Sequence, residues 1–343
     1  MRVGWPPLPL LVSVLVLGLV AEGPTTAAQP AARRPFRVGV LNPAFGTNPP
    51  SVQGIKAGLR AEGLEEDRDV VFETRVTAGN TQMLVEAARD LARARVDAIV
   101  ASGEEAARAA ARATRTVPIV FIDVGDPVAA GLVTAINRSG TNITGVSGLT
   151  TELAPKRLEL LKTIAPTLNR VWAIHHVDDH GAAAAARRAQ EAAPQLRLSV
   201  VVHRVRTAEE LTTVLKAVPP GDGLFAPAEP LLDVPGQMLI ASLWSRLPVI
   251  YVQGFWVRGV DPGRGLGGLV SYGADYEATG FQAARLVARI LRGAKPQDLP
   301  VEGAMRIQLV VNLNTAKAFR FTVPSEVLNR ADEVVQEPIG SPR

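Results

Sequence analysis

The sequence predicts an α/β protein built from two doubly wound parallel-sheet lobes that are joined by a multi-strand hinge. Three observations lead to this prediction. From Phe36 onward, short β-branched runs alternate with helical patterns, which is typical of parallel sheets with crossover helices. The alternation stops at the polar segment SGTNITGVSGL and then restarts. The chain that follows the first 28 residues is about 315 residues long, more than one hydrophobic core usually organises.

Residues 1–28 have the pattern of a cleavable export signal. Arg2 provides a charged start, PLPLLVSVLVLGLVA an apolar stretch, and the segment TAA small residues before Gln29. An uncleaved membrane anchor is the alternative, but the apolar stretch is shorter than the ~20 residues that cross a bilayer. We therefore expect a mature chain that begins near Gln29.

The pattern of residues 36–147 predicts that they form the first lobe. FRVGVLNP is a buried strand, and the following SVQGIKAGLRAEG places Val52, Ile55 and Leu59 on one helical face. VVFETRVT is the next strand and TQMLVEAARDLARARV the next helix. VDAIVASG, EEAARAAARAT and VPIVFIDVGDP continue the alternation as strand, helix and strand.

The pattern of residues 148–254 predicts that they form a second lobe of the same kind. RLELLKTIAP is a helix, and RVWAIHH, GAAAAARRAQEAA, RLSVVVHRV and TAEELTTVLKAV alternate strand with helix. DGLFAPAEP and LPVIYVQG are strands on either side of PGQMLIASLWSRL, where Pro235 suits a first helical turn.

The C-terminal segments are too few for a third lobe. They comprise the strand GLGGLVSYG, the helix YEATGFQAARLVARILRG, the strand AMRIQLVVN and the short helix NTAKAF. A chain that crosses back to the first sheet and then returns to the second explains them most simply. We assign 266–295 to the first lobe, 300–343 to the second and 255–265 to an interlobe connection. Several crossings make a hinge about which the lobes move as rigid bodies.

Composition excludes several classes of protein. Hydrophobic residues make up 47% and charged residues 20% of the chain, which excludes disorder. The net charge is +4, but in LRAEGLEEDR and ARDLARAR the basic residues stand beside acidic ones, which favours solvated faces over a nucleic-acid surface. The chain contains no cysteine, which excludes disulfides, thiolate metal sites, a cysteine nucleophile and a lipid-modified N-terminus. We therefore expect an exported form free in the periplasm.

Polar residues follow the predicted strands at their carboxyl ends, where open parallel sheets bind ligands. We therefore predict a small-molecule site there. The nominated residues are Asn42, Ser102, Gly103, Glu104, Asp123, Asp126, His176, Glu229, Gln253, Tyr272 and Asp275.

Several of these residue types also suit a role other than ligand binding. Ser102 and Gly103 open a helix whose N–H groups suit a carboxylate, but Ser102 also suits an ordinary N-cap. Asp123 and Asp126 suit a ligand ammonium, whereas Asp126 also suits a turn before Pro127. In HHVDDHG, the residue types suit a divalent metal, an organic-ligand pocket or a simple polar loop, and adjacent histidines at a strand end point to opposite faces.

Motifs for catalysis are missing from the sequence. It has no G-x-G-x-x-G after a strand, no Walker lysine pattern and no G-x-S-x-G elbow. DPGRGLGG is rich in glycine but leads into a strand, so it offers no helix N-terminus to a phosphate. We expect no enzymatic activity and no cofactor.

Nine segments between about Arg37 and Val335 carry a family resemblance: RVGVLNP, VDAIVASG, TRTVPIVFIDVGDPVAAGLV, NITGVSGLTTELAPKRLELLKTIAP, LPVIY, GGLVSYGADY, ARILRGAKPQDLPVE, LVVNLNTAKAF and TVPSEVLNRADEV. With these segments the chain resembles the ABC-transporter substrate-binding proteins related to tryptophan- and tyrosine-binding receptors, of the type I periplasmic-binding fold. It departs from them at IHHVDDHGAAA, where relatives commonly carry an asparagine- and proline-rich loop.

The resemblance implies extracytoplasmic capture of a small ligand between the lobes and its delivery to a membrane permease and ATPase. We expect a monomer that binds a small carboxylate-bearing ligand, an amino acid or a related organic acid. A ligand-sensing subunit for a membrane receptor or kinase is the alternative, and a metal-binding protein a further one. A regulator of the sugar-repressor kind shares this fold, but the chain lacks an N-terminal helix-turn-helix and begins with a signal.

Overall fold

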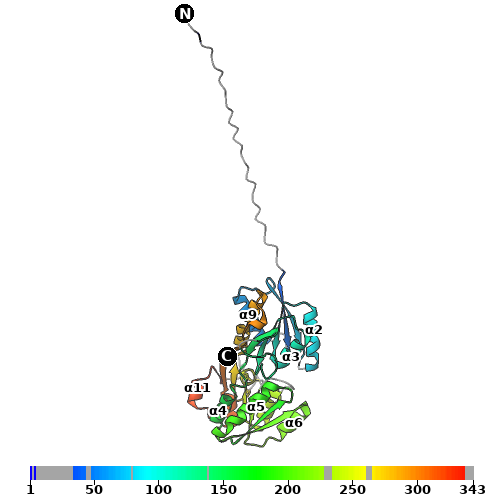
Figure 1. Cartoon of the computed structure of the whole chain (residues 1–343). Helices are drawn as coiled ribbons and strands as arrows, with labels where there is room; N and C mark the ends of the chain where they lie inside the picture. Colours follow the sequence, from blue (N-terminus) through cyan, green and yellow to red (C-terminus); the bar gives the residue numbers. More distant parts are fainter. Residues whose placement is uncertain are drawn as a thin grey trace. The chain divides into compact units, whose positions relative to one another are not determined.

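Two parallel-dominated β-sheets, each flanked by helices, organise the chain (Figure 1). The computed structural model describes Met1, Gly4 and residues 34–43, 48–78, 80–136, 139–227, 234–259 and 265–336. The predicted export signal therefore lies almost wholly outside the described residues. Contacts divide the chain into Met1–Arg34 and Pro35–Arg343, and the whole fold lies in the second unit. We call each sheet together with its helices a lobe.

The first lobe holds a six-stranded sheet in the described part of the chain, with the order β11-β5-β4-β3-β1-β2. All of its strand pairs are parallel. The strands are β1 (Phe36–Asn42), β2 (Val70–Val76), β3 (Ala98–Ser102), β4 (Ile119–Val124), β5 (Ile143–Ser147) and β11 (Glu302–Gly303). The helices are α1 (Pro50–Ala61), α2 (Leu84–Arg93), α3 (Gly103–Ala113) and α9 (Tyr276–Leu291).

Both faces of this sheet are buried, because side chains alternate along each strand. In β3, Ala98 and Val100 face a core that α1 and α9 cover. Ile99 and Ala101 face a second core formed with α2 and α3. The continuous apolar strands that the sequence shows are therefore central strands of a two-sided parallel sheet.

The second lobe holds a seven-stranded sheet among the described residues, with the order β13-β12-β10-β9-β8-β6-β7. Its strands are β6 (Arg170–His176), β7 (Ser199–Val205), β8 (Gly223–Phe225), β9 (Val249–Tyr251), β10 (Val270–Ala274), β12 (Ile307–Asn312) and β13 (Glu333–Val335). Its helices are α4 (Ala154–Ile164), α5 (His180–Ala192), α6 (Ala208–Lys216), α7 (Val234–Ser245), α8 (Phe255–Arg258), α10 (Leu313–Phe319) and α11 (Ser325–Leu328). The pair β10–β12 is antiparallel, and the others are parallel.

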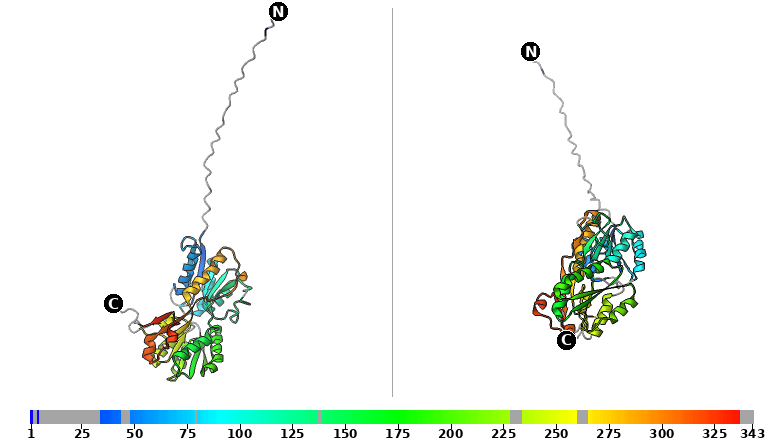
Figure 2. Two further views of the ribbon diagram at one scale, coloured as in Figure 1. Left: turned by 90° about the vertical axis from the view of Figure 1, so that its left-hand side faces the viewer. Right: turned by 60° about the horizontal axis from the view of Figure 1, so that its bottom comes forward.

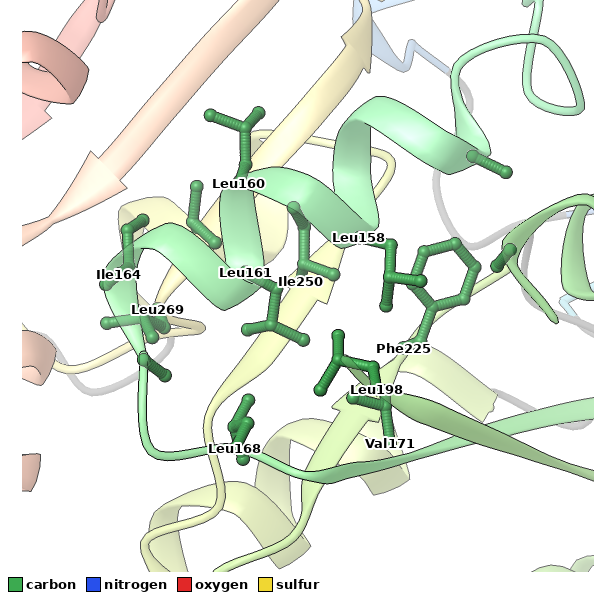
Figure 3. Close-up of a cluster of buried hydrophobic side chains, with 14 of the residues drawn as sticks. Leu158, Leu160, Leu161, Ile164, Leu168, Val171, Leu198, Phe225, Ile250 and Leu269 are labelled. Carbon is green, nitrogen blue, oxygen red and sulfur yellow. The ribbon is translucent and has the colours of Figure 1, made fainter. Parts of the chain in front are cut away.

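Helix α4 covers one face of the second sheet. Figure 3 shows Leu158 and Leu161 of α4 directed at Val171, Phe225 and Ile250 on three neighbouring strands. All five side chains are fully buried. Burial of a leucine of this kind stabilises the fold by roughly 1.5–3 kcal/mol, which fixes α4 and the chain segment that leads into it.

The chain crosses between the lobes three times, at residues 148–153, at Asp275 and at residues 304–306. The crossings lie together. A Cβ atom built on Gly303 would lie 3.1 Å from Cδ2 of Leu149, and the Asp275 N–H donates to the carbonyl of Arg306 at 3.0 Å. The predicted multi-strand hinge is therefore present in the structure.

The segments that form the hinge differ from the assigned ranges. We placed 266–295 in the first lobe, but β10 pairs with β9 and β12 of the second sheet, and only α9 returns to the first (Figure 2). Of 300–343, β11 pairs with β5 of the first sheet. A buried strand has the same apolar pattern in either sheet, so the pattern cannot say which sheet receives it.

The expected interlobe connection 255–265 also lies elsewhere. Its described residues belong to the second lobe, because the buried Asn312 side chain donates to the carbonyls of Val257 and Gly265 at 2.8 and 2.9 Å. Residues 260–264 lie outside the described residues. A glycine-rich loop indicates a tight connection but does not say which elements it joins.

Helices α1 and α9 cross at unusually short range. A Cβ atom built on Gly54 would overlap the carbonyl oxygen of Glu277, and one built on Gly280 would overlap that of Ser51. Glycine is required at both positions because the two backbones touch. This contact anchors α9, and with it the second hinge crossing, to the first lobe.

Candidate functional site

The carboxyl ends of the two sheets face each other where α3 and α5 begin (Figure 1). Helix α3 follows β3 of the first lobe directly, and α5 follows β6 of the second lobe after a short turn. Open parallel sheets bind ligands at such ends, so this boundary is the candidate site. The nominated residues lie at different positions relative to this boundary.

Glu104 lies at the boundary and contacts the other lobe. Its side chain is only 6% exposed. Oε2 accepts the Gly181 N–H at 3.1 Å, and Oε1 accepts from Arg108 Nη1 at 3.0 Å. Oε1 also lies 3.1 Å from Nδ1 of His180. Both oxygens of this predicted ligand contact are therefore engaged by protein groups.

Glycines bring the two lobes into direct contact beside Glu104. A Cβ atom built on Gly125, after β4, would lie 3.5 Å from the Cα atom of Gly181 at the start of α5. One built on Gly181 would lie 3.7 Å from the Cα atom of Gly125. The backbones of the two lobes thus approach with no side chain between them.

Ser102 and Gly103 stand at the N-terminus of α3. Ser102 is half-buried, and its side chain makes no capping hydrogen bond to α3 within the described residues. Ser102 thus occupies the N-cap position that was its alternative interpretation, but without the capping hydrogen bond. Gly103 has a φ of 81°, a left-handed conformation that favours glycine, and a Cβ atom built on it would meet only Oε2 of Glu105, at 3.9 Å. The first N–H groups of α3 remain suitable for an anion.

Asp123 has a left-handed backbone at the carboxyl end of β4. Its φ is 61°, and the pairing of β4 with β5 shifts register between Ile122 and Val124. Such a conformation costs a non-glycine residue about 1–3 kcal/mol and is concentrated at functional sites. Ser147 Oγ braces the bulge by donating to the Val124 carbonyl at 2.8 Å. The left-handed residue therefore interrupts the regular alternation of side chains at this end of β4.

Asp126 serves a local turn. Its Oδ1 accepts the Ala129 N–H at 2.9 Å, and its carbonyl accepts the Ala130 N–H. This geometry supports the turn that was the alternative for this residue.

Four other nominated residues lie at strand ends or at the hinge. Asn42 ends β1 and is buried, and Gln253 follows β9 and is half-buried. Tyr272 packs against the core of the second lobe. Asp275 caps α9 through Ala278 N–H and pairs with Arg306, so it holds a hinge crossing. Glu229 lies outside the described residues.

The histidine cluster does not converge on one point. His175 is 3% exposed, and its Nδ1 lies 2.7 Å from the carbonyl of His176. Burial lowers the pKa of His175 below the usual value for histidine. His176 accepts the Asp178 N–H, and Asp179 caps α5 through Ala182 N–H at 2.7 Å. Among the described residues, no three histidine, aspartate, glutamate or cysteine side chains are placed to hold a metal ion.

Sequence reasoning missed Arg157, which lies at the hinge. Its side chain is fully buried and donates to the carbonyls of Thr150, Ala226 and Pro227 at 2.8–3.2 Å. Its guanidinium lies 4.8 Å from the centre of the Phe225 ring. It therefore ties the first crossing to the end of β8. An arginine within the apolar face of RLELLKTI was a usable signal.

Sequence reasoning also missed the contact of Glu104 with Arg108 and Gly181, because these are ordinary residue types for a helix surface and a turn. Nothing in the local sequence of α3 or α5 indicates that the two helices meet. That contact depends on how the lobes are placed, which is a property of the whole fold.

Two α/β lobes joined by three crossings, with strand ends facing each other, form the bilobal architecture of the periplasmic-binding fold. Residues 47–335 match the family described as ABC transporter substrate binding protein, and the chain belongs to that family. Proteins of this family bind a small molecule, work with a membrane permease and carry out no reaction. The predictions of the family and of a protein without enzymatic activity are therefore confirmed.

Individual relatives support the same assignment. A tyrosine-binding protein from Clostridioides difficile is 28% identical over 225 residues, which are 65% of this chain and 62% of the relative. The match thus spans less than two thirds of the relative's length.

Solved structures confirm the predicted fold class. A conserved domain protein from Vibrio cholerae has a TM-score of 0.78 and 27% identity, covering 87% of this chain and 99% of that one. A domain from Streptococcus pneumonia in complex with L-Trp has a TM-score of 0.77 and 24% identity, covering 88% and 100%. Within the described residues, no helix combines the length and apolar character needed to cross a membrane.

Proposed function

We propose that this protein captures a small carboxylate-bearing ligand, an amino acid or a related organic acid, between its two lobes and delivers it to an ABC importer. The observation that supports the proposal is the meeting of the two sheet ends close to the strained Asp123 and to the N-terminus of α3, which has no side-chain cap among the described residues. The names of two relatives, a tyrosine-binding protein and an L-Trp complex, make aromatic amino acids the first ligands to test.

Complementary charges support an amino-acid ligand. The N–H groups that open α3 at Gly103 suit the α-carboxylate, because the positive end of the helix dipole favours an anion. The Asp123 carboxylate suits the α-ammonium group. A charge-assisted hydrogen bond of this kind contributes about 1.5–3 kcal/mol. An amino acid would satisfy both ends, whereas a simple acid would satisfy only the first.

The same proposal includes export to the periplasm and docking on an importer. The signal pattern of residues 1–28 supports cleavage and release of a monomer into the periplasm. There the closed protein would dock on the permease of an importer that an ATPase drives. A ligand shifts the equilibrium between open and closed forms only to the extent that it binds the closed form more tightly. Closure is therefore the signal to the transporter.

A thermal-shift screen of the purified mature chain tests the ligand. We expect L-Tyr or L-Trp at 100 times its Kd to stabilise the fold by about 2.7 kcal/mol, with no effect of amines that lack a carboxylate. No stabilisation by any amino acid or organic acid would contradict the proposal.

An Asp123→Asn variant tests the site. Asparagine tolerates a left-handed backbone, so the fold should persist while affinity for the amino acid falls about 10- to 100-fold by calorimetry. Asp67→Asn is the matched control, because Asp67 is exposed and has a similar φ of 65° just before β2. Equal affinities in both variants would remove Asp123 from the site.

A further inference from the structure

The contact between α3 and α5 is complete within the protein itself. Glu104 Oε2 accepts the Gly181 N–H, while Oε1 contacts Arg108 Nη1 and His180 Nδ1 at 3.0 and 3.1 Å. Arg108 Nη1 also lies 2.9 Å from His180 Nδ1, so one nitrogen with two hydrogens can serve both acceptors. No ligand is needed to satisfy these groups.

Glu104 also completes the first turn of a helix in the other lobe. Helix α5 begins at His180, and its N-cap Asp179 already accepts the Ala182 N–H. The N–H of Gly181 is another of the first-turn donors that a helix leaves without an internal partner. A carboxylate at this end is further stabilised by the helix dipole. The start of α5 therefore depends on a side chain of the first lobe.

Close backbone approach strengthens this contact. A Cβ atom on Gly181 would lie 3.5 Å from Glu104 Oε2 and 3.7 Å from the Cα atom of Gly125. Glu104 is buried at this contact, with 6% of its surface exposed. Charge-assisted hydrogen bonds are stronger in a dry environment than at an open surface.

We propose that Glu104, Arg108, His180 and Gly181 form an interlobe latch that stabilises the closed arrangement of the lobes and so raises its population before a ligand binds. The inference rests on the proposed capture of a ligand between the lobes and goes beyond it. It makes Glu104 a positioning residue for closure. Because apparent affinity scales with the fraction of binding-competent protein, the latch raises affinity without contacting the ligand.

Cysteine crosslinking tests the latch directly, because the natural chain has no cysteine. A Gly125→Cys/Gly181→Cys pair lies at a separation that a disulfide can bridge when the lobes are closed. We expect the pair to crosslink in ligand-free protein under a glutathione buffer. Adding Glu104→Gln removes about one charge-assisted hydrogen bond, a factor of about ten in the closure equilibrium, and should lower the crosslinking rate by up to that factor.

A matched control separates the latch from a general loss of charge. Glu86→Gln removes a carboxylate that also pairs with two arginines, Arg89 and Arg93, but does so within α2. This variant should crosslink at the parent rate. Equal rates in the Glu86→Gln and Glu104→Gln backgrounds, or no crosslink without ligand, would overturn the proposal.

Small-angle scattering of chains without added cysteine provides a second measurement. The ligand-free Glu104→Gln protein should have a larger radius of gyration than the natural chain, and Glu104→Asp, whose shorter side chain keeps the charge, should behave in the same way. An unchanged radius in both variants would contradict the latch.

Ligand binding distinguishes the two proposals. If crosslinking depends on Glu104 but no amino or organic acid binds, the proposed ligand fails and the latch stands. If a ligand binds and crosslinking is indifferent to Glu104, the latch fails and the proposed function stands. If both hold, Glu104→Gln should weaken ligand binding by up to the same tenfold factor.

Discussion

Arg157 connects two chain segments at the hinge. It is fully buried and donates to three carbonyl oxygens from two separate segments, Thr150 on one side and Ala226 and Pro227 on the other. A guanidinium suits this role because its five donors have a fixed planar arrangement.

Replacement of Arg157 should destabilise the protein strongly. In Arg157→Met the chain length is similar, but buried carbonyl oxygens lose their donor, so we expect the free energy of unfolding to fall by about 2–4 kcal/mol. The free energy of unfolding of Arg157→Lys should lie between those of the natural chain and Arg157→Met, since lysine keeps a charge but not the forked geometry. Urea denaturation would measure both. A methionine variant as stable as the natural chain would show that these hydrogen bonds contribute nothing net.

His175 should make stability depend on pH. Burial lowers the pKa of this side chain, so the folded state binds a proton less readily than the unfolded state, whose histidine has a pKa near 6.5. Its contribution is therefore complete above about pH 6.5 and is lost as the pH falls below that value. The pKa of His203 is lowered by burial as well, so it acts in the same direction.

A comparison of unfolding free energies at pH 7.5 and 5.5 tests this expectation. His175→Asn keeps a donor near the position of Nδ1 but does not titrate, so the loss of stability at acid pH should be smaller than in the natural chain. A loss of the same size in both proteins would assign the acid sensitivity to other groups.

At the scale of single elements, the sequence predicts what forms but not always where it goes. The alternation of strands and helices is readable because apolar periodicity depends on local burial. β10 and α9 are both recognisable, yet one belongs to each lobe, and Asp275 alone stands between them. The choice is made by partners distant in sequence, β9 and β12 for the strand and α1 for the helix.

The crossing of α1 and α9 should tolerate no side chain. Gly280→Ala places a methyl group on the carbonyl of Ser51, and we expect a loss of about 1–3 kcal/mol because the helices must separate. Arg289→Ala on the exposed face of α9 should change stability by less than about 0.5 kcal/mol. Thermal denaturation of both proteins provides the comparison, and a stable alanine variant at 280 would contradict the close approach.

At the scale of the whole molecule, the candidate site is only partly predictable. The rule that ligands bind at strand ends nominates Ser102 and Asp123 as ligand contacts, and the structure places both where a strand of the first sheet ends. It cannot distinguish a side chain that faces a ligand from one that faces the other lobe. Glu104 illustrates this limit, because its partners His180 and Gly181 are more than seventy positions away and only the folded chain brings them together.

The three crossings also determine when each half of the protein can fold. The first sheet needs β11 at Glu302–Gly303, and one of its two cores needs α9. During synthesis, that half cannot finish its interior until nearly the whole polypeptide is available, although it begins at Phe36. Contacts of such long range in sequence slow folding. A fragment that stops before α9 should therefore remain incompletely folded, since neither half consists of one continuous stretch of sequence.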